Sequence, residues 1–329
     1  MGLKNYQYNK ILREYDTKQF KSRHELEARK TALYEHLPAL KALDDEMVTN
    51  SVQSARLAIM GDEAAIERLK QANIDLSMRK MELLIEHGYP GDYLTPRYEC
   101  SDCNDTGYVG NEKCHCFKQA IVDLVYSQSN IKSVLEKENF STYSMDYFST
   151  DDVDPISGLT PRANAQRVLA ACKHFIDTFD TSYRNMLLYG NTGVGKTFMA
   201  NCIAKELLDR GHTIIYLTSF QLFNILEKQA FQKDEEGQEA DNQLSYILDC
   251  DLLIIDDLGT ELSNSFTNTK LFLVINERHL RAKSTIISTN LPIESIKSNY
   301  SERIYSRITS DYMCLKLFGD DIRIKKRFS

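Results

Sequence analysis

Eight residues with the pattern G-N-T-G-V-G-K-T, from Gly190 to Thr197, match every fixed position of the phosphate-binding loop G-x-x-x-x-G-K-[ST]. The apolar run 185–189 precedes them and predicts a buried strand, and 198–208 follows with a helical pattern. Glycines let backbone N–H groups turn toward phosphate oxygens, and the helix N-terminus adds a positive dipole end. The alternative, a glycine-rich turn that binds nothing, is disfavoured by the strand and helix around it.

This loop predicts specific roles for its residues. We expect Lys196 to reach the β- and γ-phosphates of a nucleotide and the Thr197 hydroxyl to ligate Mg²⁺. The residues expected to contact the nucleotide are Gly190, Asn191, Thr192, Gly193, Val194, Gly195, Lys196, Thr197 and Phe198.

Two adjacent acids, Asp256 and Asp257, end a second apolar run that starts at Leu252 and predicts a buried strand. An enzyme with a phosphate-binding loop needs a carboxylate near the Mg²⁺ shell, and we expect Asp256 to fill that role. Asp257 is the next residue and should point to the other side, so we expect it to activate the attacking water as a general base. The pair alone is a weak signal, but its place about 60 residues after the loop strengthens it.

A third apolar run, 284–290, also ends in polar side chains. We expect Asn290, with Thr289 behind it, to orient water against the γ-phosphate, and the alternative is an asparagine that caps the strand. Farther along, Arg303 and Arg307 are four residues apart and should share one face of a helix. Taken alone, this arginine pair is typical of an ordinary surface face.

Four of the eight cysteines lie close together in the sequence, at Cys100, Cys103, Cys114 and Cys116. The turn residues 105–107 separate the two pairs, so both can meet at one tetrahedral point, and we expect a structural Zn²⁺ site without an open position for water. A disulfide pair is disfavoured in the cytosol, and a redox C-x-x-C would not need the second pair. An iron–sulfur cluster also takes four cysteines and stays an alternative. His115 could replace one of its two neighbouring ligands.

The composition is that of a water-soluble protein. Its 329 residues suffice for two domains, and its net charge of −7 argues against a surface that binds nucleic acid throughout, although a local basic groove is compatible with it. No apolar run approaches the roughly 18 residues of a membrane span. The N-terminus 1–6 lacks the apolar core of a signal peptide. We therefore expect a cytoplasmic protein without a membrane segment.

Residues 1–95 predict mainly helix, since helix-favouring residues dominate, and the helix from Asp62 to Glu86 with Gly88 after it is the best case. This region is either a helical scaffold or a partner-docking module. Residues 96–136 hold the cysteines and a connecting helix over 117–136.

Residues 137–329 form the third part, in which helix and strand alternate from about residue 160 onward. The candidate strands are 185–189, 213–218, 252–256, 284–289 and 312–317. This alternation predicts an α/β domain around a parallel sheet. The acidic stretch 233–239 indicates a solvated loop. Only 22 residues follow Arg307, too few for a helical lid domain, so we expect any closure over the nucleotide to come from another subunit.

Together, these motifs resemble the bacterial replicative-helicase loaders of the DnaC/DnaI type, a branch of the AAA+ ATPases close to the initiator DnaA and to IstB. The resemblance covers about Asn139 to Arg323. Its marks are Asn139-Phe140, G-N-T-G-V-G-K-T, L-L-I-I-D-D-L-G, S-T-I-I-S-T-N-L and E-R-I-Y-S-R. The segment C-x-x-C-N-D-T-G-Y resembles loader-like proteins of Gram-positive bacteria and their phages.

The resemblance implies an α/β AAA+ P-loop domain without a C-terminal lid, preceded by a helical region and a small zinc module. It makes Arg307 an arginine finger acting in trans, with Arg303 assisting, and matches Asn290 to the first sensor. It also implies ATP as substrate, self-association through the ATPase domain, a DnaB-type replicative helicase bound through the N-terminal region, and single-stranded DNA along the assembled ATPase domains. No basic and aromatic platform for such DNA is evident in the sequence, and Arg323 lies in a terminal family motif to which no role is assigned.

The sequence thus predicts an ATP-dependent helicase loader with weak, partner-regulated ATPase activity. One alternative is an IstB-like transposition helper, whose ATPase domain would look nearly the same. Another is a non-hydrolysing adaptor with a structural nucleotide, which the presence of Asp256, Asp257 and Arg307 disfavours.

Overall fold

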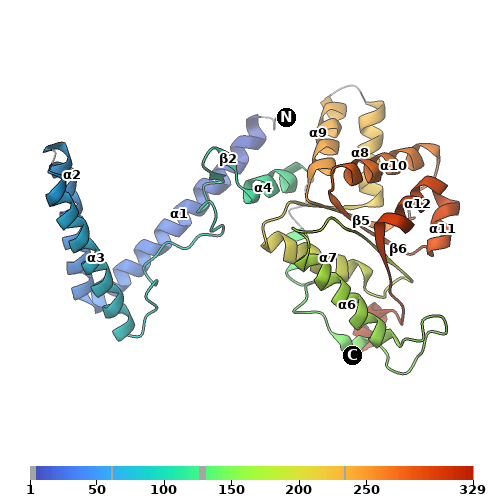
Figure 1. The fold of residues 1–329 in the computed structure, drawn as a ribbon, viewed down its shortest axis with the longest axis horizontal. Helices are drawn as coiled ribbons and strands as arrows, with labels where there is room; N and C mark the ends of the chain where they lie inside the picture. The colour runs from blue at the N-terminus through green and yellow to red at the C-terminus, as the bar shows by residue number, and fades with distance from the viewer. Residues whose placement is uncertain (1–4, 61, 126–130, 233–234, 329) are drawn as a thin grey trace. The chain divides into compact units, whose positions relative to one another are not determined.

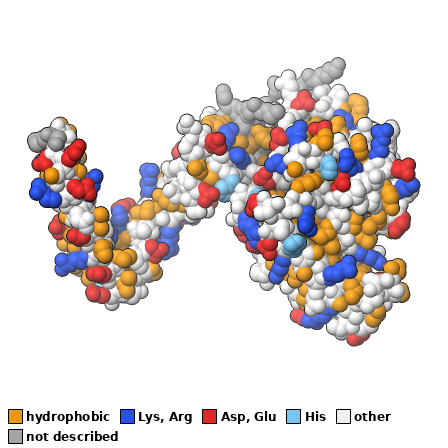
Figure 2. Space-filling model, viewed as in Figure 1, with side chains coloured by type: hydrophobic (Ala, Val, Ile, Leu, Met, Phe, Trp, Pro, Cys, Tyr) orange, Lys and Arg blue, Asp and Glu red, His pale blue; other side chains and the backbone are white. Residues whose placement is uncertain are grey.

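The computed structural model describes residues 5–60, 62–125, 131–232 and 235–328. Contacts along the chain divide it into two compact units, Tyr8–Cys114 and His115–Ser329 with Met1–Gln7. Within the described ranges, no helix combines the length and the apolar character that crossing a membrane requires. On the face drawn in Figure 2, acidic and basic side chains are interspersed over both units.

The first unit is helical. Its elements are α1 (Asn5–His36), α2 (Pro38–Met60), α3 (Glu63–Glu86) and the short hairpin of β1 (Tyr108–Val109) and β2 (Glu112–Lys113). Helices α2 and α3 pack against each other as an antiparallel pair (Figure 1). Helix α3 starts where the sequence predicts, because the Asp62 carboxylate accepts the backbone N–H of Ala65 at 3.0 Å. It ends before Gly88, whose φ of 79° is the left-handed conformation that glycine permits after a helix.

The second unit is an α/β domain. Its elements are α4 (His115–Val125), α5 (Ile131–Leu135), the 3-10 turn η2 (Met145–Tyr147), α6 (Pro161–Asp177), β3 (Asn185–Tyr189), α7 (Lys196–Asp209), β4 (Ile214–Thr218), α8 (Ser219–Phe231), α9 (Glu235–Asp249), β5 (Leu252–Leu258), α10 (Ser265–Leu280), β6 (Ser284–Thr289), α11 (Ile293–Asn299), α12 (Glu302–Asp311), β7 (Tyr312–Lys316) and α13 (Ile322–Phe328). The strands form one parallel sheet in the order β4-β5-β6-β3-β7. The predicted fold class is confirmed, and beyond β7 the described chain forms only α13.

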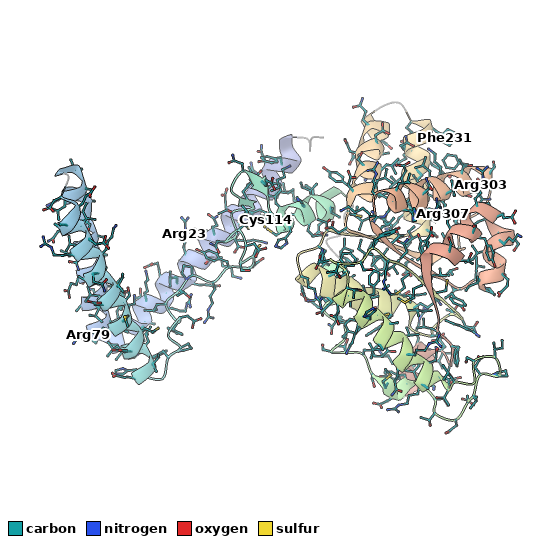
Figure 3. The ribbon with its side chains drawn as sticks, viewed as in Figure 1. Arg23, Arg79, Cys114, Phe231, Arg303 and Arg307 are labelled. Atoms are coloured by element: carbon teal, nitrogen blue, oxygen red, sulfur yellow. The ribbon has the colours of Figure 1, made fainter. Side chains whose placement is uncertain are left out.

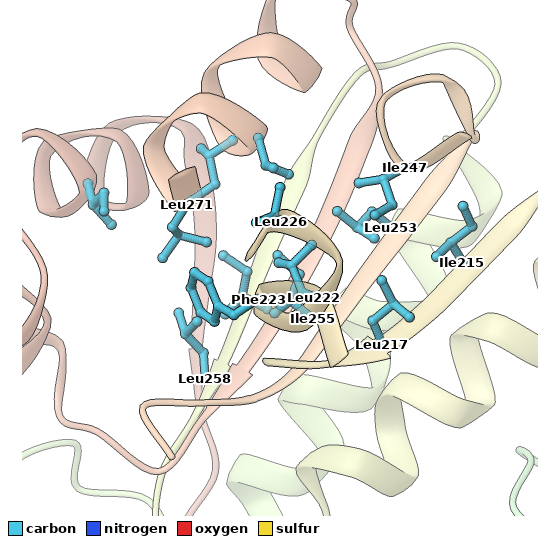
Figure 4. Close-up of a cluster of buried hydrophobic side chains, with 14 of the residues drawn as sticks. Ile215, Leu217, Leu222, Phe223, Leu226, Ile247, Leu253, Ile255, Leu258 and Leu271 are labelled. Atoms are coloured by element: carbon cyan, nitrogen blue, oxygen red, sulfur yellow. The ribbon is translucent and has the colours of Figure 1, made fainter. Parts of the chain in front are cut away.

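Because successive side chains of a strand point to opposite faces of the sheet, alternate residues pack into two separate hydrophobic cores, one on each face. Leu253 and Ile255 of β5 join side chains of α8, α9, α10 and α12 on one face of the sheet (Figure 4). Leu252 and Ile254 join those of α6 and α7 on the other face. Because helices cover both faces, the strands are continuously apolar rather than alternating, which is the pattern of a buried parallel sheet.

The parallel direction brings the carboxyl ends of the strands to one edge. Tyr189 of β3 pairs with Thr289 of β6, and Thr218 of β4 pairs with Asp256 of β5. The phosphate-loop motif and both polar strand ends therefore meet at the same edge, where open α/β sheets bind ligands.

Two secondary-structure predictions differ from the structure. Residues 235–239 were expected in a solvated loop but form the first turn of α9, while 233–234 lie outside the described residues. The buried Ala240 and Ile247 anchor this helix on the core, and acidic residues in a first turn favour the helix dipole. In the range 117–136, where one helix was predicted, the described residues form α4 and α5. Residues 126–130 lie outside the described residues.

Candidate functional site

The phosphate-loop motif connects β3 to α7 with three glycines in left-handed conformations. Gly190, Gly193 and Gly195 have φ of 139°, 79° and 96°. A Cβ on Gly190 would lie 1.9 Å from the carbonyl oxygen of Leu317, and one on Gly193 would lie 2.0 Å from the Asp321 carboxyl carbon. Gly190 therefore needs glycine for both the backbone angle and the space, whereas at Gly193 the backbone angle is the requirement, because the Asp321 side chain can move.

Lys196 begins α7 and folds back over the loop. Its Nζ donates to the carbonyl oxygens of Gly190 at 2.9 Å and Asn191 at 2.7 Å, and to Asn290 Oδ1 at 2.7 Å. The structure thus brings the loop lysine and the predicted sensor Asn290 into direct contact. Burial lowers the pKa of Lys196, while the charges of Asp257 and Asp256 oppose that effect.

Asp256 is buried and accepts hydrogen bonds from three hydroxyl groups. Thr197 Oγ1 donates to its Oδ1 at 3.3 Å, Ser288 Oγ also donates to Oδ1, and the Tyr216 hydroxyl donates to Oδ2 at 2.7 Å. Adjacent oxygen ligands of an octahedral Mg²⁺ lie about 3 Å apart for bonds of about 2.1 Å. The Thr197 hydroxyl and the Asp256 carboxylate therefore fit the ligand type and spacing of Mg²⁺, which would neutralise phosphate charge there.

Asp257 is the next residue after Asp256, and its side chain has a different orientation because its backbone has a left-handed φ of 55°. Its side chain is only partly buried and lines the same cavity as Asp256. Burial, followed by the charge of Asp256, raises the pKa of the Asp257 carboxyl, and Lys196 and Arg323 oppose this rise. A carboxyl with a raised pKa at the phosphate end of a cavity has the property expected of a general base.

These side chains line a cavity of ≈ 480 Å³, a size typical of small-molecule sites. Six of the predicted nucleotide contacts line it: Thr192, Gly193, Gly195, Lys196, Thr197 and Phe198. Gly190, Asn191 and Val194 are not among the lining residues, and Val194 packs into the core.

Aromatic side chains also line the cavity: Tyr143, Tyr147, Phe148 and Phe198. The ring centroids of Tyr143 and Phe198 are 5.8 Å apart, and Lys326 lies 5.4 Å from the Tyr147 ring centroid. A cavity lined by both aromatic rings and charged side chains can accept the base and the phosphates of a nucleotide.

A family model described as IstB-like ATP binding protein matches residues 155–328, more than half of the chain. The chain belongs to this family. Two proteins of Escherichia coli (strain K12) are similar to it. The uncharacterized protein YdaV is 25% identical over 193 residues, 58% of this chain and 70% of that protein. The replicative helicase loader DnaC is 23% identical over 189 residues, 55% of this chain and 76% of that protein.

Among solved structures, the DnaC helicase loader matches with a TM-score of 0.45 and 21% identity, covering 56% of this chain and 99% of that chain. DnaI matches with a TM-score of 0.46 and 18% identity, covering 57% of this chain and 94% of that chain. The family match confirms the resemblance stated from the motifs: residues 155–328 are an IstB/DnaC-type AAA+ domain, and the family binds ATP.

The two arginines lie on α12 of this AAA+ domain (Figure 3), and they are not among the residues that line the cavity. Arg303 is exposed, and Arg307 is half-buried. Arg307 donates to Asp311 Oδ2 at 3.1 Å and to Asn276 Oδ1 at 2.9 Å. Neither arginine lines the cavity of its own chain.

Arg323 is the main residue to which sequence reasoning assigned no role. Together with Ile322 and Lys326 of α13 it lines the cavity, and the Ile322 N–H donates to the Gly193 carbonyl oxygen at 2.9 Å. The expectation that closure comes only from another subunit is therefore wrong in part, because the C-terminal segment of the same chain borders the site. The motif Gly319–Arg323 is visible in the sequence, but the contact between its Ile322 and Gly193, 129 residues earlier, is not.

The four clustered cysteines converge as predicted from their spacing. Their sulfur atoms all lie within 4.8 Å of one another, and the Sγ atoms of Cys100 and Cys114 are 3.8 Å apart. A tetrahedron with metal–sulfur bonds of about 2.3 Å requires a sulfur–sulfur distance of about 3.8 Å. His115 is not part of this group, and its ring faces Gly211. The cluster can hold a metal ion with four thiolates, and zinc stays a prediction.

Asp105 organises the loop of the cysteine cluster. Its carboxylate accepts the backbone N–H groups of Glu99 and Cys100, each at 2.9 Å, and its φ of 56° is left-handed. The N–H of Gly107 points to Cys103 Sγ at 3.3 Å, which stabilises a thiolate.

The raised pKa of Asp257 predicts an acid limb in the rate of ATP turnover. Because the base form is lost when the pH falls through this pKa, turnover should decrease at a higher pH than an unperturbed aspartate would give. Asp257→Asn should lower kcat by about 10²- to 10⁴-fold and remove the limb. Steady-state kinetics as a function of pH measure both. An Asp257→Asn variant with wild-type turnover would contradict the assignment.

The cysteine cluster predicts one Zn²⁺ per chain, measured by elemental mass spectrometry on the purified protein. A Cys103→Ser/Cys114→Ser double variant should lose the metal, because only two thiolates of the group remain. Cys314→Ser, at a half-buried cysteine of β7, is the matched control and should keep it. Iron with acid-labile sulfide in the wild type, or equal zinc content in both variants, would contradict the prediction.

Proposed function

We propose that this chain is an ATP-dependent loader of a DnaB-type replicative helicase onto single-stranded DNA during replication initiation. Two observations support the proposal: a cavity with two oriented acids in an IstB/DnaC-type AAA+ domain, and a separate helical unit in the same chain. ATP·Mg²⁺ binds the assembled state more tightly than the unassembled state and thereby stabilises it. Hydrolysis removes this stabilisation, and the complex dissociates.

We assign helicase binding to the helical unit. Its α3 carries four exposed apolar residues at spacings of three and four, which form one stripe: Ile74, Met78, Met81 and Ile85, each at least 46% exposed. Exposed apolar residues on the packed neighbour α2 are Val48, Val52 and Ile59. A stripe of exposed apolar side chains such as the one on α3 marks a protein–protein contact site.

We infer that the ATPase domains associate side by side and that Arg307 completes the cavity of a neighbour. The contacts with Asp311 and Asn276 hold its guanidinium on α12, close to the exposed Arg303. An arginine supplied in trans is worth about 10³- to 10⁵-fold in hydrolysis rate. The isolated chain should therefore be a weak ATPase whose rate depends on assembly.

An aromatic pair on α8 and α10 supports contact with single-stranded DNA. Phe231, 72% exposed, has its ring centroid 5.2 Å from that of Phe266 (Figure 3). Lys270 Nζ lies 5.7 Å from the Phe266 centroid and donates to Gln229 Oε1 at 2.9 Å. An exposed ring beside a fixed ammonium group offers base stacking and phosphate attraction together. This platform of Phe231, Phe266 and Lys270 was not evident in the sequence because the two phenylalanines are 35 positions apart.

The second candidate function is an IstB-like transposition helper, which the matching family model favours. It would use the same cavity and the same arginine. The partner distinguishes the two functions: a helicase for the loader and a transposase for the helper.

A nucleotide-dependent complex with the replicative helicase of the same organism is the expected result for a loader. Mass photometry should detect this complex with a non-hydrolysable ATP analogue, and the complex should be lost in Lys196→Ala and weakened in Arg307→Ala. Arg281→Ala, at an exposed arginine paired with Asp249, is the matched control and should behave as the wild type. A complex with a transposase and none with the helicase in any nucleotide state would favour the transposition helper instead.

Phe231→Ala should weaken binding of an oligo-dT strand about 10-fold, since stacking is worth about 1–3 kcal/mol per base. Fluorescence anisotropy with the ATP analogue measures this, and the slope of affinity against salt should not change because no phosphate contact is lost. Phe220→Ala, at a phenylalanine of the same helix that is 70% exposed, is the control and should bind as the wild type. Equal affinity of both variants would argue against the platform.

A further inference from the structure

The backbone of Asp257 is held in its left-handed conformation from both sides. Its N–H donates to Ser288 Oγ at 3.1 Å. Its carbonyl oxygen accepts the Ser219 hydroxyl at 3.1 Å and the Thr260 hydroxyl at 2.9 Å. A left-handed φ is unfavourable for any residue with a Cβ, so these contacts determine where the carboxylate points.

The need for these contacts comes from a bulge in the sheet. Ile255 pairs with Ile287, and Leu258 pairs with Thr289, so two residues of β5 oppose one residue of β6. The two residues of β5 in this bulge are Asp256 and Asp257, and the single residue of β6 opposite them is Ser288. A bulge leaves a backbone N–H without a ladder partner, and here the Ser288 side chain accepts it.

Ser288 contacts both acids with a single hydroxyl group. It is fully buried, it donates its only proton to Asp256 Oδ1, and it accepts the N–H of Asp257 on its oxygen. The same Oδ1 atom of Asp256 accepts the hydroxyl of Thr197, the predicted Mg²⁺ ligand. The hydroxyl therefore joins the carboxylate beside the metal position to the backbone that orients the second acid.

We propose that Ser288 is a positioning residue for ATP hydrolysis: its hydroxyl aims the Asp257 carboxylate at the phosphate end of the cavity and couples that orientation to Asp256. The proposal rests on the ATPase activity in the proposed function. Without the hydroxyl, the Asp257 N–H has no acceptor, and the backbone can relax toward a right-handed or extended conformation. The carboxylate then moves away from the attacking water, while the glycine loop and Lys196 still bind the nucleotide.

The test is a double-mutant cycle in the full chain, with intrinsic ATP turnover measured without helicase or DNA. Ser288→Ala should lower kcat about 10-fold or more and change KM for ATP by less than about 3-fold. Asp257→Asn with Ser288→Ala should be no slower than Asp257→Asn alone, because Ser288 acts through Asp257 while Thr197 and Tyr216 still donate to Asp256. Ser288→Cys keeps the shape of the side chain with a larger atom but has only a weak donor and acceptor, and should resemble Ser288→Ala.

Ser284→Ala is the matched control, at a buried serine at the start of the same strand β6, and should keep wild-type kinetics. The proposal is overturned if Ser288→Ala turns over as the wild type, or if its loss multiplies with that of Asp257→Asn. The helicase experiment can fail while this cycle succeeds, since no partner takes part in it. A wild-type chain that does not hydrolyse ATP would overturn both the ATPase proposal and the positioning role.

Discussion

The hydrogen bonds to the buried carboxylate of Asp256 are the interaction on which the nucleotide site depends. Its three hydroxyl donors come from α7, β4 and β6, which are neighbours only because the sheet is parallel and ordered β4-β5-β6-β3-β7. A buried carboxylate without donors would be costly. The sheet therefore fixes the acid, and the acid in turn fixes the relative positions of the phosphate loop and the two neighbouring strand ends.

Charge explains why this arrangement suits a nucleotide with a divalent cation. Two adjacent acids, Asp256 and Asp257, face Lys196 and Arg323 across one cavity. The raised pKa of Asp257 and the lowered pKa of Lys196 both result mainly from burial, so each charged form is disfavoured there. Mg²⁺ and phosphates bound there would supply compensating charges of both signs, so we expect the pair to bind more favourably than either alone. We therefore expect the cavity to bind ATP and Mg²⁺ together.

Features encoded locally were predictable from the sequence. The strands at 185–189 and 284–289 have the predicted bounds, because apolar runs between turn residues specify them. The glycine loop and the acids at the strand end were placed by their motifs. Features that depend on tertiary contacts were not predictable: the packing of Ile322 and Arg323 beside Gly193, the Phe231–Phe266 pair, and the bulge that Ser288 fills. The first turn of α9 was missed because its acidic residues give no local sign of the core that anchors the helix.

Calorimetric titration of the purified chain with ATP, at low and at millimolar Mg²⁺, measures whether nucleotide and Mg²⁺ bind together in the cavity. We expect one nucleotide per chain, tighter binding when Mg²⁺ is present, and loss of that Mg²⁺ dependence in Asp256→Asn. Binding with the same affinity with and without Mg²⁺, or no binding at all, would contradict it.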